Sequence, residues 1–381
     1  MQQNKMKVIP VYLPQFHTIP ENDEWWGEGF TEWRNVKNAK PLFEGHYQPR
    51  VPLNDNYYDL SLVDTLKWQA ELAKKYGIYG FCMYHYYFNG HKLLEKPMEM
   101  LLAHPEIDLK YCVCWANHDW TDGWKATDGH ERILIAHDFN DENSWVEHFN
   151  YLLPFFKDPR YISENNKPFM VIYVPNIIKK LNKMLTLWNN MAKESGFDGL
   201  TFIYQSAMSC ADPLWDRSKF DYGVHFQPGY VGWASKSKLK MLLRWKLIKI
   251  WRSVRNVLRI KKRDVVGAAP ESVSTFNYDE CWQKILNLRP DSDRIIPSGF
   301  VDWDNSPRKQ MRGSVCIGAS PEKFKKYFRQ LVKNTREFYK QDKIFFFAWN
   351  EWAEGGYLEP DEKFKYSYLE AIKEVLDEED L

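Results

Sequence analysis

Short apolar runs alternate with longer stretches of helical periodicity along most of this 381-residue chain. The apolar runs have the length and composition of buried strands. They predict eight strands, at residues 8–12, 79–87, 111–116, 169–174, 200–205, 222–227, 294–301 and 344–349. Helical periodicity between the strands is clearest at residues 59–76, 176–195, 279–288, 321–340 and 362–376.

This alternation of strand and helix predicts an α/β fold. Repeated βα units at this count fit a (β/α)8 TIM barrel better than an open, doubly wound sheet. No G-x-G-x-x-G motif follows a predicted strand, which also disfavours a dinucleotide-binding sheet. We therefore predict a single barrel domain over residues 1–381, with long aromatic loops and a basic helical insertion at residues 236–264.

The segment between the first strand and about Tyr57 is predicted to be a long loop. It is rich in aromatic side chains and also carries an acidic one: Trp25, Trp26, Phe30, Glu32 and Trp33. Loops of this length inside a compact domain are usually functional.

Polar and aromatic residues recur where the predicted strands end. In a barrel of this type the carboxyl ends of the strands carry the chemistry. These ends hold Gln15, His17, His85, Tyr86, Asn117, His118, Asp119, Gln205, His225, Gln227, Trp303, Asp304, Asn350 and Glu351. A single histidine after a strand is usually a structural hydrogen-bonding group, but so many ends bearing such residues predict a ring that binds sugar.

Aromatic residues make up 16% of the chain, and seventeen of them are tryptophans. Carbohydrate binding explains this number, and so does an unusually aromatic core. In the motif HDWTDGW, we expect Asn117 and Asp119 to hydrogen-bond sugar hydroxyls and Trp120 to stack on a ring. One histidine with carboxylates is a poor metal-ligand set, and the six cysteines lack zinc-type spacing, so no metal or other cofactor is predicted.

Residues 236–264 hold twelve Lys and Arg against one Asp, a net charge of +11 in a chain whose total is +1. On a helix, their leucines and isoleucines gather opposite the arginines, the pattern of a segment lying on an anionic membrane. Packing on the barrel with a solvated basic face is one alternative. Nucleic-acid binding is disfavoured, because the rest of the chain is acidic and lacks a nucleic-acid motif.

No apolar run approaches the roughly 20 residues needed to span a bilayer. The first residues lack the apolar core of a signal peptide. We therefore expect a cytoplasmic protein, with contact at the inner face of the membrane if the basic segment binds lipid.

The last predicted strand runs into FFFAWNEWAEGGYLEPD at residues 345–361, where an apolar run gives way to carboxylates and glycines. Glu351 and Glu354 lie three residues apart at this bend, beside Trp349 and Trp352. Indole rings stack on pyranose faces, and their low polarity raises the pKa of a nearby carboxyl group. The pair predicts acid and base chemistry on a sugar, and a solvated acidic loop is the alternative.

Four motifs extend this interpretation over nearly the whole chain. They are WNEWAEG with LEP at residues 349–360, IPVYLPQFHTIPENDEWWGEGFTEW at residues 9–33, YGFCMYHYYF at residues 79–88, and WANHDWTDGW at residues 115–124. Together they resemble glycoside hydrolase family 99, the endo-α-mannosidases, and the related WbsX-type polysaccharide-biosynthesis proteins. The chain is more similar to the WbsX group, because the mannosidases usually carry a histidine where this chain has Ala353.

The resemblance implies a catalytic role for both glutamates. Glu351 would help the substrate's own 2-hydroxyl group attack, which gives a 1,2-anhydro sugar, while Glu354 protonates the leaving oxygen and later activates the acceptor. Configuration at the anomeric carbon would be retained, and Glu359 would have a supporting role at most. Substrate binding is expected from Gln15, His17, Trp33, His85, Tyr86, Asn117, Asp119, Trp120, Gln205, His225, Gln227, Trp303, Asp304, Asn350 and Trp352.

These observations predict a glycan-processing enzyme, a glycosyltransferase or a retaining glycosidase or transglycosylase, in the synthesis of a surface polysaccharide such as O-antigen (lipopolysaccharide) or capsule. Its partner would be an oligosaccharide or lipid-linked glycan. A conventional nucleotide-sugar transferase would normally show a Rossmann-like fold and often an Asp-x-Asp motif, and neither is evident. The alternatives are a retaining endo-acting hydrolase that degrades a polysaccharide, and a non-catalytic glycan-binding subunit of an assembly complex.

Overall fold

A computed structural model of the protein describes residues 5–122, 132–206, 216–234 and 272–379. Within these residues, nine parallel strands form one sheet in the order β12-β10-β9-β8-β4-β2-β1-β15-β13. Their bounds are β1 Lys7–Tyr12, β2 Gly80–Phe88, β4 Lys110–Trp115, β8 Lys167–Ile172, β9 Thr201–Ser206, β10 Tyr222–His225, β12 Ile295–Ile296, β13 Ser298–Phe300 and β15 Lys343–Phe347.

The sheet curls into a nearly closed barrel. Its edge strands, β12 and β13, are separated only by Pro297, whose carbonyl oxygen accepts a hydrogen bond from the Phe345 backbone N–H at 3.1 Å. β12 pairs with β10 on one side and β13 pairs with β15 on the other. The two short strands together occupy the predicted strand at residues 294–301, divided at a proline that cannot donate to the ladder. The predicted (β/α)8 barrel, with eight strand positions, is confirmed.

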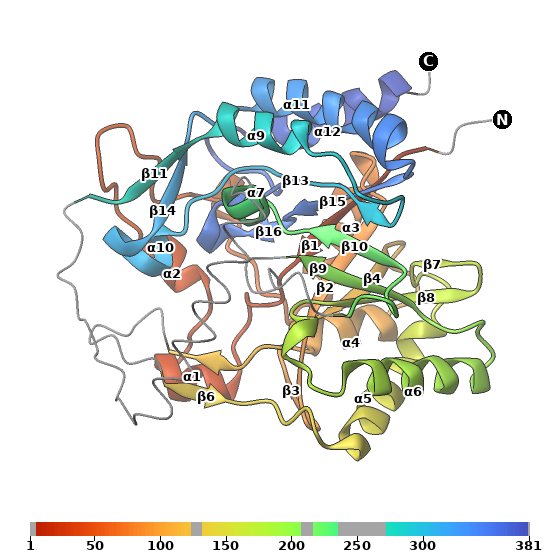
Figure 1. Cartoon of the computed structure of the whole chain (residues 1–381). Coiled ribbons are helices and arrows are strands. Elements are labelled where there is room, and N and C mark those ends of the chain that lie inside the picture. The colour runs from red at the N-terminus through yellow and green to blue at the C-terminus, as the bar shows by residue number, and fades with distance from the viewer. Residues whose placement is uncertain (1–4, 123–131, 207–215, 235–271, 380–381) are drawn as a thin grey trace, which may run out of the picture.

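Helices surround this barrel. Figure 1 shows α9, α11 and α12 gathered on one side, with α5 and α6 on the opposite side. The helices are α1 Pro20–Trp26, α2 Trp33–Asn38, α3 Val63–Lys75, α4 Lys96–Ala103, α5 Glu142–Phe156, α6 Leu181–Glu194, α7 Gly229–Ala234, α9 Tyr278–Asn287, α10 Ser306–Lys309, α11 Pro321–Asn334 and α12 Ser367–Glu379.

Several elements differ from the prediction. The long aromatic loop contains α1 and α2. α4 and α5 lie between predicted strands, where helices were expected without stated bounds. The helix expected at residues 176–195 begins at Leu181, because Pro175–Ile177 forms a 3-10 turn. The helix expected at residues 321–340 changes after Asn334 into a π-helical turn, Thr335–Tyr339.

Two short strands pair with barrel strands: β3 His91–Leu93 with β2, and β7 Ser163–Glu164 with β8. Three further pairs form between loop segments: β5 Trp120–Thr121 with β6 Ile133–Ile135, β11 Ser274–Asn277 with β14 Ser314–Ile317, and β16 Asn350–Glu351 with β17 Gly356–Tyr357. The predicted basic insertion at residues 236–264 lies outside the described residues. No helix in the described part of the chain has both the length and the apolar character needed to cross a membrane.

Candidate active site

A cavity of about 300 Å³ lies at the carboxyl ends of the barrel strands. Seven strand positions contribute to its walls, through the ends of β2 and β15 and the segments after β1, β4, β8, β10 and β13, and the loop that contains α1 covers one side. The lining residues are Leu13, Gln15, Asn22, Trp26, Phe30, Glu32, Tyr84, Tyr86, His118, Asp119, Trp120, Thr121, Tyr173, Phe226, Arg308, Lys309, Phe347, Glu351 and Glu354.

Two carboxyl groups of this wall come from the turn after β15. Glu351 ends β16 and is only 2% exposed, whereas the Glu354 side chain, at the end of the 3-10 turn Trp352–Glu354, is 19% exposed. Both contact the guanidinium group of Arg308, with Nη2 to Glu351 Oε1 at 3.1 Å and Nη1 to Glu354 Oε1 at 2.9 Å. Glu32 adds a third carboxylate, 3.2 Å from Arg308 Nε. One cation therefore joins three carboxyl groups.

Burial and charge change the titration of Glu351. Burial raises the pKa of its carboxyl group to about 8; the Arg308 charge opposes this shift, and the negative charges of Glu354 and Glu32 add to it. Three carboxylates around one guanidinium would leave an excess of negative charge, so the cluster favours holding one proton. Glu351 is the most buried of the three, and burial favours its protonated form.

The turn that carries the two glutamates is fixed from behind. The Trp352 indole stacks on Tyr357 at 3.8 Å and donates a hydrogen bond to Glu359 Oε2 at 2.7 Å. Glu359 also accepts hydrogen bonds from Tyr58 and Gln69, both at 2.7 Å. Burial raises the pKa of Glu359 to about 7. Within this arrangement Glu359 supports the turn and does not line the cavity.

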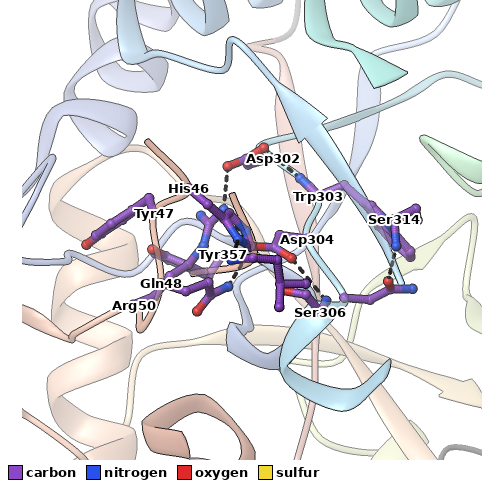
Figure 2. Close-up of polar contacts among 12 residues, drawn as sticks. His46, Tyr47, Gln48, Arg50, Asp302, Trp303, Asp304, Ser306, Ser314 and Tyr357 are labelled. Atoms are coloured by element: carbon purple, nitrogen blue, oxygen red, sulfur yellow. Dashed lines mark hydrogen bonds and ion pairs between the residues drawn. The ribbon is translucent and has the colours of Figure 1, made fainter. Parts of the chain in front are cut away.

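A second network fixes the loop after β13 (Figure 2). Asp304 Oδ2 accepts hydrogen bonds from Gln48 at 2.6 Å and contacts His46 Nε2 at 2.8 Å, and Asp302 pairs with Arg50 at 2.8 Å. Burial alone would raise the pKa of Asp304, but hydrogen bonds from these partners and from Ser306, with the Arg50 charge, lower it to about 2.

This network reaches the catalytic candidates from two directions. The Asp304 backbone N–H donates to the Glu354 carbonyl oxygen at 2.7 Å. Asp304 Oδ1 accepts from the Ser306 N–H at 3.0 Å at the start of α10, the helix that carries Arg308. Gly355, at φ +69°, lets the turn pass close by, because a Cβ there would lie 2.9 Å from the Asp304 nitrogen.

The structure brings part of the predicted site to the cavity. The residues of the predicted ring and pair that line it are Gln15, Tyr86, His118, Asp119, Trp120, Glu351 and Glu354. Gln15 and Tyr86 are hydrogen-bonded to each other at 3.0 Å, and Gln15 also accepts from Arg308 at 3.1 Å. Asp119 accepts a hydrogen bond from the His137 backbone N–H at 2.8 Å, which ties down the loop that holds Trp120.

His85 lies outside the cavity because of strand alternation. Tyr84 and Tyr86 of β2 line the cavity, so His85 between them points to the other face of the strand. There it contacts His148 of α5, with the two Nε2 atoms 2.9 Å apart. Its place is in the packing between barrel and helix.

Three predicted polar residues are buried and bonded to backbone. Asn117 binds Val174 through both its amide atoms at 2.8 and 2.9 Å, Asn350 binds Leu13 in the same way at 2.8 and 3.0 Å, and Gln227 accepts from the Val231 N–H at 3.3 Å. Asn117 and Asn350 thus join neighbouring loops, Gln227 binds within its own segment, and none of the three lines the cavity.

The other predicted residues also lie behind the lining. The Gln205 side-chain amide donates a hydrogen bond to the Tyr84 hydroxyl at 3.4 Å. His225 stacks on Tyr230 with ring centroids 3.8 Å apart, and His17 is only 2% exposed. The Trp33 indole donates to the Tyr58 carbonyl oxygen at 2.8 Å, and Trp352 is fixed as described above. Trp303 packs on Phe347, with ring centroids 5.5 Å apart, and Asp304 lies in the network of Figure 2.

Sequence reasoning missed several lining residues, of which Arg308 matters most. It follows the Trp303-Asp304 loop by a few positions, but no pattern in the sequence singles out one arginine among many. Tyr84 could have been found from its spacing of two from Tyr86 on a strand. In the described part of the chain no group of three or more His, Cys, Asp or Glu is placed to hold a metal ion.

Comparison with known proteins identifies the family. The model of the family "Glycosyltransferase WbsX" matches residues 8–372, and this chain belongs to that family of carbohydrate-active enzymes. It is 32% identical over 375 residues to the uncharacterized protein WxcX of Xanthomonas campestris pv. campestris strain B100. The aligned region covers 97% of this chain and 49% of WxcX. The chain thus spans about half the length of the curated relatives it matches.

Solved structures support the fold. The GH99 endo-alpha-mannosidase from Bacteroides thetaiotaomicron is similar with a TM-score of 0.53, covering 97% of this chain and 96% of that one at 13% identity. A glycoside hydrolase-like protein is similar with a TM-score of 0.52 at 13% identity, covering 98% and 94%. The predicted resemblance to WbsX proteins and to family 99 is confirmed.

Proposed function

We propose that the protein transfers or hydrolyses a sugar at its anomeric carbon during synthesis of a surface polysaccharide, with Glu351 and Glu354 as the reacting carboxyl groups. The observation that carries this proposal is the convergence of both groups on Arg308 at the wall of an aromatic cavity. Enzymes that act at an anomeric centre typically use two carboxyl groups at the wall of a sugar-binding cavity. Membership of the WbsX glycosyltransferase family supports synthesis.

The difference in burial supports different roles. In the reacting form the one proton of the cluster would sit on Glu354, and Glu351 would be ionised. Glu351, deep in the wall, would then take the proton of the 2-hydroxyl group, whose oxygen attacks the anomeric carbon and forms a 1,2-anhydro sugar. Glu354, nearer solvent, would give its proton to the departing glycosidic oxygen. Glu354 would then take a proton from the acceptor hydroxyl or water as it opens the ring, and Glu351 would return its proton to the 2-oxygen. Two inversions give retention.

The charge of the cavity supports a neutral sugar in a glycosidic linkage. Its described lining holds four carboxyl groups, Glu32, Asp119, Glu351 and Glu354, against the cations Arg308 and Lys309. With one proton shared by the cluster, three negative charges still face two positive ones. A diphosphate would meet this excess of negative charge, which disfavours a nucleotide-sugar donor at this position. Gln15 and Tyr86 would hydrogen-bond sugar hydroxyls and Trp120 would stack on a ring, and their position on the cavity wall supports these roles.

Contact with an anionic membrane through residues 236–264 remains a proposal from their charge and periodicity. It would place the enzyme at the inner membrane face, beside a lipid-linked glycan. We expect wild-type protein to float with anionic liposomes in a sucrose gradient, and protein with Arg252, Arg255 and Arg259 changed to Gln to float less. Equal flotation of the two proteins would exclude this role of the segment.

Product analysis by mass spectrometry tests the function. Wild type and the double variant Glu351→Gln/Glu354→Gln are incubated with the producer's own lipid-linked or released glycan. A lengthened glycan made only by the wild type would support transfer. A shortened glycan made only by the wild type would instead support the endo-acting hydrolase. Identical glycans with both proteins, together with glycan binding, would reject catalysis and leave a binding subunit.

A further inference from the structure

Arg308 belongs to a different strand end from the two glutamates it binds. It lies on α10, after β13, whereas Glu351 and Glu354 follow β15. Its guanidinium group contacts Glu32 through Nε, Glu354 through Nη1, and both Glu351 and Gln15 through Nη2, all between 2.9 and 3.3 Å. The side chain is 14% exposed. This fork fixes where the two carboxyl groups lie relative to each other.

The same contacts set the charge around Glu351. The ionisable side chains that line the cavity around Glu351 are Glu32 before α2, Tyr84 and Tyr86 of β2, His118 and Asp119 after β4, Tyr173 after β8, Arg308 and Lys309 of α10, and Glu354 of the 3-10 turn. Arg308 is the one cation among the described residues that touches Glu351. Without it, Glu351 would face Glu32 and Glu354 with no direct compensation.

We propose that Arg308 is the positioning residue of the carboxyl pair: its guanidinium sets the spacing of Glu351 and Glu354 and allows Glu351 to lose its proton beside two other carboxylates. The inference rests on the proposed function for its catalytic meaning. A purely structural role, in which Arg308 only joins the two loops, predicts lower stability without a change in how Glu351 titrates.

A direct titration separates these cases. Full-length protein labelled with ¹³C at glutamate carboxyl carbons is titrated by NMR, and the Glu351 signal is assigned by its loss in Glu351→Gln. In Arg308→Met we expect the Glu351 midpoint to move up by one pH unit or more, and in Arg308→Lys to stay within half a unit of wild type. Arg329→Met is the control, because Arg329 pairs with Glu378 on the outer helices. An unmoved midpoint in Arg308→Met would overturn the proposal.

Glu32→Gln provides a second variant of opposite sign. It removes a negative charge beside Glu351 while keeping Arg308, so the Glu351 midpoint should move down. This test stands even where Arg308→Met does not fold. A midpoint that stays or rises in Glu32→Gln would count against the electrostatic part of the proposal.

Kinetics test the spacing. Arg308→Lys keeps the positive charge but loses the forked guanidinium group. We therefore expect kcat to fall at least tenfold, while KM stays within twofold of wild type and the pH dependence of the rate does not shift. Unchanged kcat would overturn the spacing role. The NMR titration needs no turnover: if the wild type processed no glycan while the Glu351 midpoint still moved, the proposed function would fail and the charge role of Arg308 would stand.

Discussion

At the residue scale, the two glutamates show how one short turn gives similar groups different chemistry. Glu351 is 2% exposed, and burial raises its pKa to about 8, whereas the Glu354 side chain is 19% exposed. A base whose conjugate acid has a pKa near 8 is stronger than an ordinary carboxylate, but it acts only in its ionised form. The pH dependence of turnover therefore reports the role of Glu351.

We expect kcat/KM on a glycan substrate to fall as the pH increases through about 8. The sign follows from the two proposed roles together, because the reaction needs Glu351 ionised while Glu354 still holds a proton, and above this pH the pair has lost its last proton. Rate measurements from pH 6 to 9.5 check it, with Glu351→Gln expected to lose about 10³-fold in rate and to lack this limb. If activity instead kept rising through pH 8, the reaction would need no proton on either glutamate, and Glu354 would not be the acid.

Leaving-group dependence tests Glu354. In Glu354→Gln we expect activity to be partly restored on substrates with an acidic phenol as leaving group, because such a group departs without a proton. Glu351→Gln should show no such recovery, since the attack of the 2-hydroxyl group still lacks its base. Matching losses for the two variants on natural and activated substrates would contradict the assignment.

At the element scale, the active-site turn depends on a loop from another strand. The network of Asp304, His46 and Gln48 joins the loop after β13 to the segment before α3, and through backbone groups it holds both Glu354 and the start of α10 (Figure 2). We infer that Asp304 acts on the site through Glu354 and Arg308, since it does not line the cavity.

Asp304→Ala should therefore lower both stability and activity. Removing Asp304 leaves His46 Nε2 and Gln48 Nε2 without their carboxylate partner. We expect this to cost about 3 kcal/mol in the free energy of unfolding, measured by urea denaturation. Asp158→Ala is the matched control, because Asp158 pairs with Arg160 at 2.6 Å near the start of β4, at the other end of the barrel. At a temperature where both variants are folded, we expect kcat to fall at least tenfold only in Asp304→Ala. Equal activity in both would show that the network serves stability alone.

This network also shows what a sequence can reveal. The apolar runs placed all eight strand positions, because a buried parallel strand needs no partner to be recognised. His85 was misjudged as a lining residue although the alternation from Tyr86 was available. His46 and Asp304 are in contact although 258 positions separate them in the sequence, and Arg308 and Glu351 are 43 positions apart. Neither contact follows from a local sequence pattern. Such pairings need the tertiary fold.

At the scale of the whole molecule, buried ionisable groups make the fold sensitive to pH on both sides of neutrality. In the described part of the chain four histidines are buried in neutral form, with pKa values lowered chiefly by burial: His17 to about 4, His85 and His225 to about 3, and His148 well below its usual value. Burial also lowers the pKa of His137, to about 4, and that of His118. Below about pH 6.5 the unfolded chain binds protons that the folded chain does not, so each of the four buried histidines destabilises the fold by about 1.4 kcal/mol per pH unit.

Glu351 and Glu359 act in the opposite direction. Burial raises their pKa values to about 8 and about 7, so the folded chain holds protons that the unfolded chain has released. Their stabilising contribution is complete below the unfolded pKa of about 4.3 and declines as the pH rises through 7 and 8. Below pH 6.5 these histidines outnumber the two carboxyl groups. Above pH 6.5 the histidines no longer contribute, so among these groups Glu351 and Glu359 set the slope.

We therefore expect the melting temperature, measured by calorimetry from pH 5 to 9, to be highest between about pH 6.5 and 7. It should fall by several degrees towards pH 5.5 and more slowly towards pH 8.5. Glu351→Gln removes one of the two titrating carboxyl groups, so its decline above pH 7 should be shallower, while its acid side stays as in the wild type. A melting temperature that climbed steadily to pH 8.5 in the wild type would mean that Glu351 and Glu359 are ionised in the folded protein. Glu351 would then enter the reaction as an ordinary carboxylate.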